Sequence, residues 1–188
     1  MAGVVDIVNR ALGLVGQEPV TSMDDRTPVA AKVRRFWPEV RDSVLRAHLW
    51  KCAQRRDALV RLADAPAFGF TAQFQLPGDY LRLVDVEPAT ARYQVEGRRL
   101  LADVDAVSIV YVRREEDATL YDPQLREALA YKLASELAYG DTASTSLAQA
   151  LDQQYRVRLS EATGTDAREG DPDVSMQPSR WVSAHRGR

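Results

Sequence analysis

The period of the hydrophobic residues changes twice along this chain of 188 residues. Residues 4–50 and 122–163 place apolar side chains three and four positions apart, which is typical of helices that bury one face. Between them, residues 70–113 carry short alternating or β-branched runs joined by turn-forming dipeptides. This order predicts an α+β fold, mainly an α-helical bundle, with a small antiparallel β module inserted between the second and third helices.

Residues that favour helix ends stand where the first two helical segments should begin and end. Gly16 follows the first apolar stripe and is placed to end the first helix. Thr27 as N-cap and Pro28 in the first helical position are a typical start for the second. Pro38 lies inside that second segment, where its ring and missing N–H predict a kink or a split near Phe36.

The helical period returns after Asp122-Pro123, again a capping residue followed by proline. Gly140 should end this third helix, and a fourth should start at residues 141–142 and lie antiparallel to it. After Gly164 the chain has no helical stripe, which predicts an extended tail. The third helix carries a ridge of leucines spaced four residues apart: Leu125, Leu129, Leu133 and Leu137.

Short strands should make up the β module. Residues 93–103 predict a hairpin that turns near Glu96-Gly97, and residues 105–115 predict a β-branched strand. Residues 51–62 fit either a helix or a strand. In a predicted strand at residues 80–87, strict alternation would separate two sets of side chains: Tyr80, Arg82, Val84 and Val86 on one face, Leu81, Leu83 and Asp85 on the other.

These segments divide the chain into three parts: residues 1–52 with 120–167 as the helical bundle, 53–119 as the β module, and 168–188 as an extended C-terminal tail. The chain is long enough to bury a core without disulfides or metals, and it contains a single cysteine. No apolar run approaches the ~18 residues of a membrane helix. The N-terminus has no basic leader, so we expect a protein that is made in the cytoplasm and has no membrane partner.

Residue types that catalyse reactions are not grouped as catalysis requires. His48 lies near a helix end, and His185 lies in the predicted tail, where a reaction is hard to preorganise. Cys52 has basic neighbours that could lower its pKa, yet no histidine is spaced to pair with it. We therefore expect no enzyme, no cofactor and no metal site.

Paired arginines are the strongest basic signal, although a net charge of −2 argues against a dedicated nucleic-acid binder. Acidic residues stand close to most of the pairs, which favours solvated surfaces or intersubunit ion-pair networks. Contact with a phosphate backbone in a channel is the weaker alternative. The pairs are Arg34-Arg35, Arg55-Arg56, Arg98-Arg99 and Arg113-Arg114.

Several segments, taken in order, are similar to one known family. They are DIVNRALGLVGQEPVTSMDD, FWPEVRDSVLRAHLWKCAQRRDAL, FQLPGDYLRLVDV, YQVEGRRLLAD, SIVYVRREEDATLYDPQLREALAYKLASELA and RWVSAHRGR. Together they resemble the head–tail adaptor of short-tailed bacteriophages, also called tail tubular protein A or head completion protein. The resemblance covers nearly the whole chain. At residues 48–52 this sequence lacks the proline before tryptophan and the phenylalanine after it that the family commonly has.

The resemblance implies a structural virion protein at the head–tail junction, without an active site. Such adaptors form a homo-oligomeric ring, commonly of twelve copies, beneath the portal ring, and they extend the DNA channel. The implied partners are the portal protein, the next tail (nozzle) protein, further copies of the chain, and double-stranded DNA that passes without sequence-specific binding.

The family's C-terminal segment is expected to dock onto the portal. The last ten residues here, SRWVSAHRGR, have the composition of an interface anchor, because tryptophan and arginine are enriched at binding hot spots. Such a segment would gain order on its partner, whereas a merely frayed terminus is the alternative. The predicted docking residues are Arg180, Trp181, Val182, His185, Arg186 and Arg188.

Two other functions remain as alternatives to the adaptor. One is a cytoplasmic binding or regulatory protein with a helical bundle and no virion role, which would form a stable small dimer indifferent to portal. The other is an enzyme that uses Cys52 or an acidic loop, which would show unusual thiol reactivity. A large ring, or a monomer that becomes a ring only with portal, would favour the adaptor.

Overall fold

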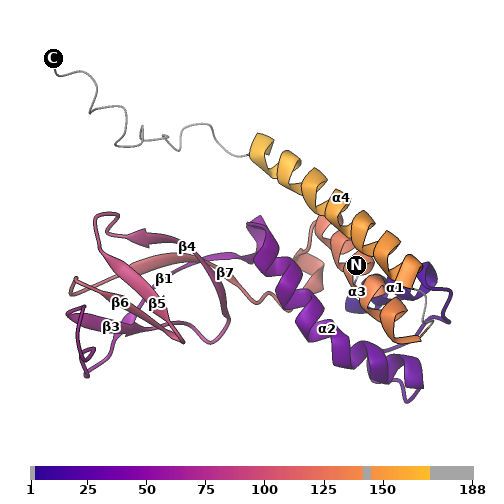
Figure 1. Ribbon diagram of the computed structural model, residues 1–188, viewed down its shortest axis with the longest axis horizontal. Coiled ribbons are helices and arrows are strands. Elements are labelled where there is room, and N and C mark those ends of the chain that lie inside the picture. Colours follow the sequence, from indigo (N-terminus) through magenta and orange to yellow (C-terminus); the bar gives the residue numbers. More distant parts are fainter. Residues whose placement is uncertain (1–2, 142–144, 170–188) are drawn as a thin grey trace.

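The computed structural model describes residues 3–141 and 145–169, with strands at one end of an elongated molecule and helices at the other (Figure 1). Within these residues, α-helices pack beside two antiparallel sheets. The α+β class predicted from the changes of period is therefore confirmed. The division into three parts stays a prediction.

The described helices and strands have the following bounds. The helices are α1 (Val4–Leu14), α2 (Pro28–Ala47), α3 (Pro123–Asp141) and α4 (Thr145–Glu169). The strands are β1 (Gln54–Ala58), β2 (Val60–Arg61), β3 (Ala72–Gln75), β4 (Tyr80–Glu87), β5 (Tyr93–Glu96), β6 (Arg99–Ala102) and β7 (Ser108–Arg113). Short 3₁₀ helices η1 (Lys51–Ala53) and η2 (Ala118–Leu120) lie where the chain passes between helices and strands.

Two predicted helix starts are confirmed by their capping contacts, whereas Asp141, expected to begin the fourth helix, is the last residue of α3. The Thr27 side chain accepts a hydrogen bond from the Ala30 amide at 3.2 Å, and Asp122 accepts one from the Leu125 amide at 2.8 Å. After α1, Gly16 adopts a positive φ of 71°, a conformation that glycine tolerates best. The capping side chains of Thr27 and Asp122 and the backbone freedom of Gly16 therefore determine these helix ends.

One proline and two glycines were expected to break or end helices, but the helices continue through all three positions. α2 continues through Pro38 without a split, and α3 passes Gly140 to end at Asp141. α4 passes Gly164 and ends at Glu169, so residues 168–169 belong to the helix and not to the predicted tail. A single glycine costs a helix only about 1 kcal/mol, which neighbouring contacts can offset. The remaining tail residues, 170–188, lie outside the described residues.

α3 lies at the centre of the helical part and contacts α1, α2 and α4. Its predicted leucine ridge is buried throughout. Two ion pairs give the direction of α4: Lys132 pairs with Asp152 at 3.4 Å, and the earlier Glu127 pairs with the later Arg158 at 3.4 Å. The later residue of α3 contacts the earlier residue of α4, and the earlier residue of α3 contacts the later one. The two helices therefore run antiparallel, as predicted.

The strands form two sheets, with orders β1-β7-β4 and β2-β3-β6-β5. The predicted hairpin is confirmed: Glu96 pairs with Arg99 across a two-residue turn, and Gly97 has a φ of 57°. All described strand pairs are antiparallel.

β4 has the predicted bounds but not the predicted alternation. Its pairing with β7 shifts register twice, and each irregularity turns the following side chains to the other face. One set of β4 side chains therefore packs between the two sheets and the other packs toward the helices: Tyr80, Leu83 and Val86 in the first set, Leu81 and Val84 in the second.

Buried side chains gather in two clusters on either side of the β1-β7-β4 sheet. β7 contributes to both, since Val112 packs with the helices while Ile109 and Tyr111 pack with the second sheet. The β1-β7-β4 sheet is thus the middle layer between the helices and the β2-β3-β6-β5 sheet (Figure 1). This layering leaves the outer face of the second sheet far from the helices.

Candidate interaction surface

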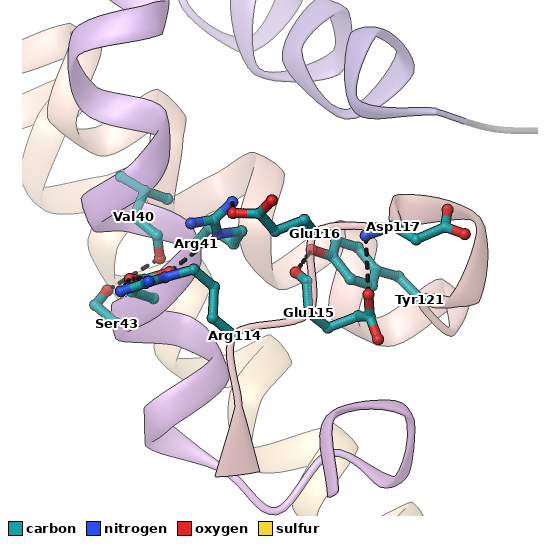
Figure 2. Close-up of polar contacts among 9 residues, drawn as sticks. Val40, Arg41, Ser43, Arg114, Glu115, Glu116, Asp117 and Tyr121 are labelled. Atoms are coloured by element: carbon teal, nitrogen blue, oxygen red, sulfur yellow. Dashed lines mark hydrogen bonds and ion pairs between the residues drawn. The ribbon is translucent and has the colours of Figure 1, made fainter. Parts of the chain in front are cut away.

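Ion pairs join α2 to the segment between β7 and α3 (Figure 2). Arg41, only 9% exposed, donates to Asp42 at 2.9 Å and to Glu116 at 3.2 Å. Arg114 donates to the other oxygen of Asp42 at 2.7 Å. These contacts fix the direction in which the strands leave the helices.

A second set of buried contacts lies in the segment between β7 and α3. We call this connection between α2 and the strands the joint. The hydroxyl of Tyr121 donates to the backbone carbonyl of Glu115 at 2.5 Å (Figure 2). The Glu115 carboxylate, in a residue 5% exposed, accepts from the Asp117 amide at 2.9 Å and pairs with Arg113. Burial raises the pKa of Tyr121, so its hydroxyl keeps the proton that it donates. The polar groups of the joint are therefore satisfied by one another, which suits a structural connection.

His48 and Cys52, the candidate catalytic residues that the structure describes, are partly buried side chains, and His185 lies outside the described residues. His48 meets the ring of Trp50 edge-on, with 4.8 Å between ring centroids. Burial, with the negative charges of Asp122 and Glu115, raises the pKa of Cys52 to about 11, opposite to the shift that its basic sequence neighbours could cause. Among the described residues, no group of three or more His, Cys, Asp or Glu side chains is placed to hold a metal ion.

We expect Cys52 to react with iodoacetamide about a hundredfold more slowly than a free peptide cysteine at mildly alkaline pH. Only the thiolate is nucleophilic, and a pKa of about 11 leaves far less thiolate than the roughly 8.5 of a free cysteine. Alkylation rates measured by mass spectrometry test this expectation, and denaturation in urea should restore the peptide rate. A folded rate equal to the peptide's would contradict it.

Exposed apolar side chains concentrate on the second sheet and the loop before β3. Phe68 is 88% exposed and Val60 is 72% exposed, which is unusual for side chains of this size. Tyr93 and Val95 on the edge strand β5 are also exposed. Large exposed apolar side chains in one region often mark a protein-binding surface.

A hollow of about 730 Å³ lies on the outer face of this sheet, beside the loop of residues 65–70. The guanidinium of Arg92 stands 4.4 Å from the centroid of the Phe70 ring and pairs with Asp103 at 2.8 Å, which lowers the pKa of that carboxyl. Arg99 donates to Gln73 at 2.9 Å on the floor. We call this hollow and its Phe68 rim the Phe68 surface. Its fixed charges and aromatic rim suit a protein partner.

The paired arginines act mainly inside the chain. Arg55 pairs with Asp57 at 3.3 Å, and Arg34 donates to the backbone carbonyl of Asp25 at 2.9 Å. Arg98 donates to the carbonyl of Pro77 at 2.6 Å. With Arg113 and Arg114 in the joint, these arginines are held by contacts within the chain, so intersubunit ion pairs and phosphate binding both stay predictions.

The predicted docking residues, Arg180, Trp181, Val182, His185, Arg186 and Arg188, all lie outside the described residues. The Phe68 surface, by contrast, was missed by sequence reasoning. Its only local signal is APAFGF, residues 65–70, in which two phenylalanines stand in a loop rich in glycine, alanine and proline.

Neither a protein-family model nor a curated protein matches this chain. In residues 3–141 and 145–169, no helix combines the length and the apolar character needed to span a bilayer. The functional argument therefore rests on the chain's own sequence order and surfaces.

Proposed function

We propose that this protein is a subunit of the head–tail adaptor ring of a short-tailed bacteriophage. In this role it binds beneath the portal, extends the DNA channel and carries the next tail protein. The observation that carries the proposal is the order of the sequence segments that resemble that family, which extends over nearly the whole chain.

The arrangement of the helices and strands supports a division of tasks within such a ring. Residues 1–52 and 120–167 would form the bundle that packs against neighbouring copies, and residues 53–119 would reach away from it. The Phe68 surface lies on the sheet farthest from the helices, where a platform for the next tail protein is required. The ion pairs Arg41–Glu116 and Arg114–Asp42, which join α2 to the segment after β7, would keep the platform at a fixed angle.

The position of α4 determines where the C-terminal segment starts, and this supports docking by that segment. Thr163 Oγ1 lies 3.4 Å from His48 Nδ1, so the last turns of α4 pass beside the end of α2. Residues 170–188 follow α4, and 19 extended residues can span about 60 Å. That length is sufficient to reach a neighbouring portal subunit.

Reconstitution tests this function. Purified protein mixed with purified portal should give a complex whose mass equals portal plus a ring of this chain, visible in electron micrographs as a collar. The next tail protein should bind to that complex and not to portal alone. A species that stays small and indifferent to portal would instead support the regulatory alternative.

A further inference from the structure

Strand β5 leaves one edge of the second sheet unpaired. In the β5–β6 hairpin, Glu96 faces Arg99 across the turn, and the Asp103 amide donates to the carbonyl of Arg92 at 3.3 Å. Backbone groups alternate in an antiparallel pair, so residues 92, 94 and 96 bond toward β6. The amides and carbonyls of Tyr93 and Val95 therefore point away from the sheet, and they have no partner among the described residues.

The sequence of this edge is complementary to itself. If two β5 strands run antiparallel with Gln94 opposite Gln94, Tyr93 stands opposite Val95 of the second copy. In the same register Arg92 stands opposite Glu96 of the second copy. Aromatic side chains opposite β-branched ones and opposite charges are both favourable cross-strand pairs.

We propose that two copies of this protein associate through their β5 edges, so that the β2-β3-β6-β5 sheet continues antiparallel into the same sheet of the second copy. The register places Tyr93 and Val95 in hydrogen-bonded positions, which gives four backbone hydrogen bonds around a twofold axis at Gln94. This contact goes beyond the proposed adaptor role, because it belongs to the protein before it meets portal.

The side chains of the edge are available for this pairing. All four residues of β5 are exposed, and the Arg92 side chain is 65% exposed. Arg92 uses Nε for Asp103 and Nη2 for the Gly69 carbonyl, which leaves Nη1 to meet a carboxylate. The Glu96 carboxylate accepts a hydrogen bond from the Gln94 side chain at 2.8 Å, and no other contact of this carboxylate is seen among the described residues.

The edge also lacks most features that normally prevent strand pairing. β5 contains no proline or lysine, and its register with β6 is regular. Its short length limits the contact to far less than the roughly 1,200 Å² of a standard stable interface. The dimer should therefore be weak and should dissociate on dilution, unlike the stable dimer expected of a regulatory protein.

Complementary charge variants test the proposal. Glu96→Arg places arginines opposite each other, and Arg92→Glu places glutamates opposite each other, so each variant alone should raise the dimer Kd about tenfold. Mixed together, the two variants restore opposite charges at both positions and should form a heterodimer at least as tight as the unmodified dimer. Sedimentation velocity over a concentration series, with one variant fluorescently labelled, measures both outcomes.

Val95→Pro is the backbone control. It removes an amide that points away from β6, so the hairpin should fold, while one hydrogen bond on each side of the twofold axis is lost. Unfolding temperature and circular dichroism check that every variant is folded. If Arg92→Glu fails to fold, Glu96→Arg and Val95→Pro decide alone. A purely monomeric unmodified protein, or unchanged dimerisation in these two variants, would overturn the proposal.

Discussion

Deletion of residues 171–188 should abolish attachment of the ring to purified portal and leave the rest of the protein folded. The deleted segment contains Trp181 with Arg180, Arg186 and Arg188, the residue types that carry most binding energy at protein interfaces. Removal of a single hot-spot side chain typically costs 2 kcal/mol or more, and this deletion removes several. Co-sedimentation of ring and portal measures the loss.

A smaller change and a matched control sharpen this test. Trp181→Ala alone should weaken attachment by roughly 30-fold, which corresponds to about 2 kcal/mol. Phe68→Ser changes an exposed side chain in the loop before β3, outside the deleted segment, so portal attachment should stay normal in that variant. Thermal unfolding of the deletion variant should match that of the full chain. Undiminished attachment after deletion would end the docking hypothesis.

Local residue chemistry was sufficient to predict where α2 and α3 begin. Thr27 with Pro28 and Asp122 with Pro123 carry capping side chains and a fixed φ within two adjacent residues, so no distant contact is needed. The hairpin at Gly97 is similar, because its turn is made by neighbouring residues. These elements were predicted correctly for that reason.

Features that depend on distant contacts were not predictable in this way. The faces of β4 are set by irregular pairing with β7, a strand some thirty residues away, so alternation alone assigned Leu83 and Val84 wrongly. Cys52 has basic neighbours in sequence, yet burial and then the negative charges of Asp122 and Glu115 raise its pKa. Each outcome follows from tertiary packing that no local pattern encodes.

The two candidate surfaces also differ in whether local sequence or tertiary packing forms them. Composition predicts a docking tail, because tryptophan and arginine stand out in a segment without apolar periodicity. The Phe68 surface needs the fold, since its rim in residues 65–70 meets Gln73, Arg92 and Arg99 only when β3, β6 and the start of β5 lie side by side. Sequence reasoning therefore predicts a linear site, which stays a prediction, and it missed the surface that the fold assembles.

Trp50→Ala should destabilise the protein by about 3–5 kcal/mol, the usual cost of removing a buried tryptophan. Trp50 is 1% exposed and stands between the end of α2 and the start of η1. Its indole Nε1 donates to the carbonyl of Val44 at 2.9 Å. The last four carbonyls of a helix have no partner within the helix, so Trp50 satisfies one of those of α2.

Urea unfolding of Trp50→Ala and Trp50→Phe separates the two contributions. Phenylalanine retains much of the buried apolar volume but leaves the Val44 carbonyl without its donor, which should cost about 1–3 kcal/mol. Arg82 of β4 satisfies the Arg46 carbonyl at 3.0 Å, and Arg46 donates to the Leu81 carbonyl of β4. Both contacts remain in both variants, so α2 stays linked to the sheet. A loss below 1 kcal/mol in Trp50→Ala would mean that the end of α2 is not held by this side chain. Because domains are commonly stable by only 5–15 kcal/mol, the expected loss is a large share of the free energy of unfolding and should lower the urea midpoint clearly.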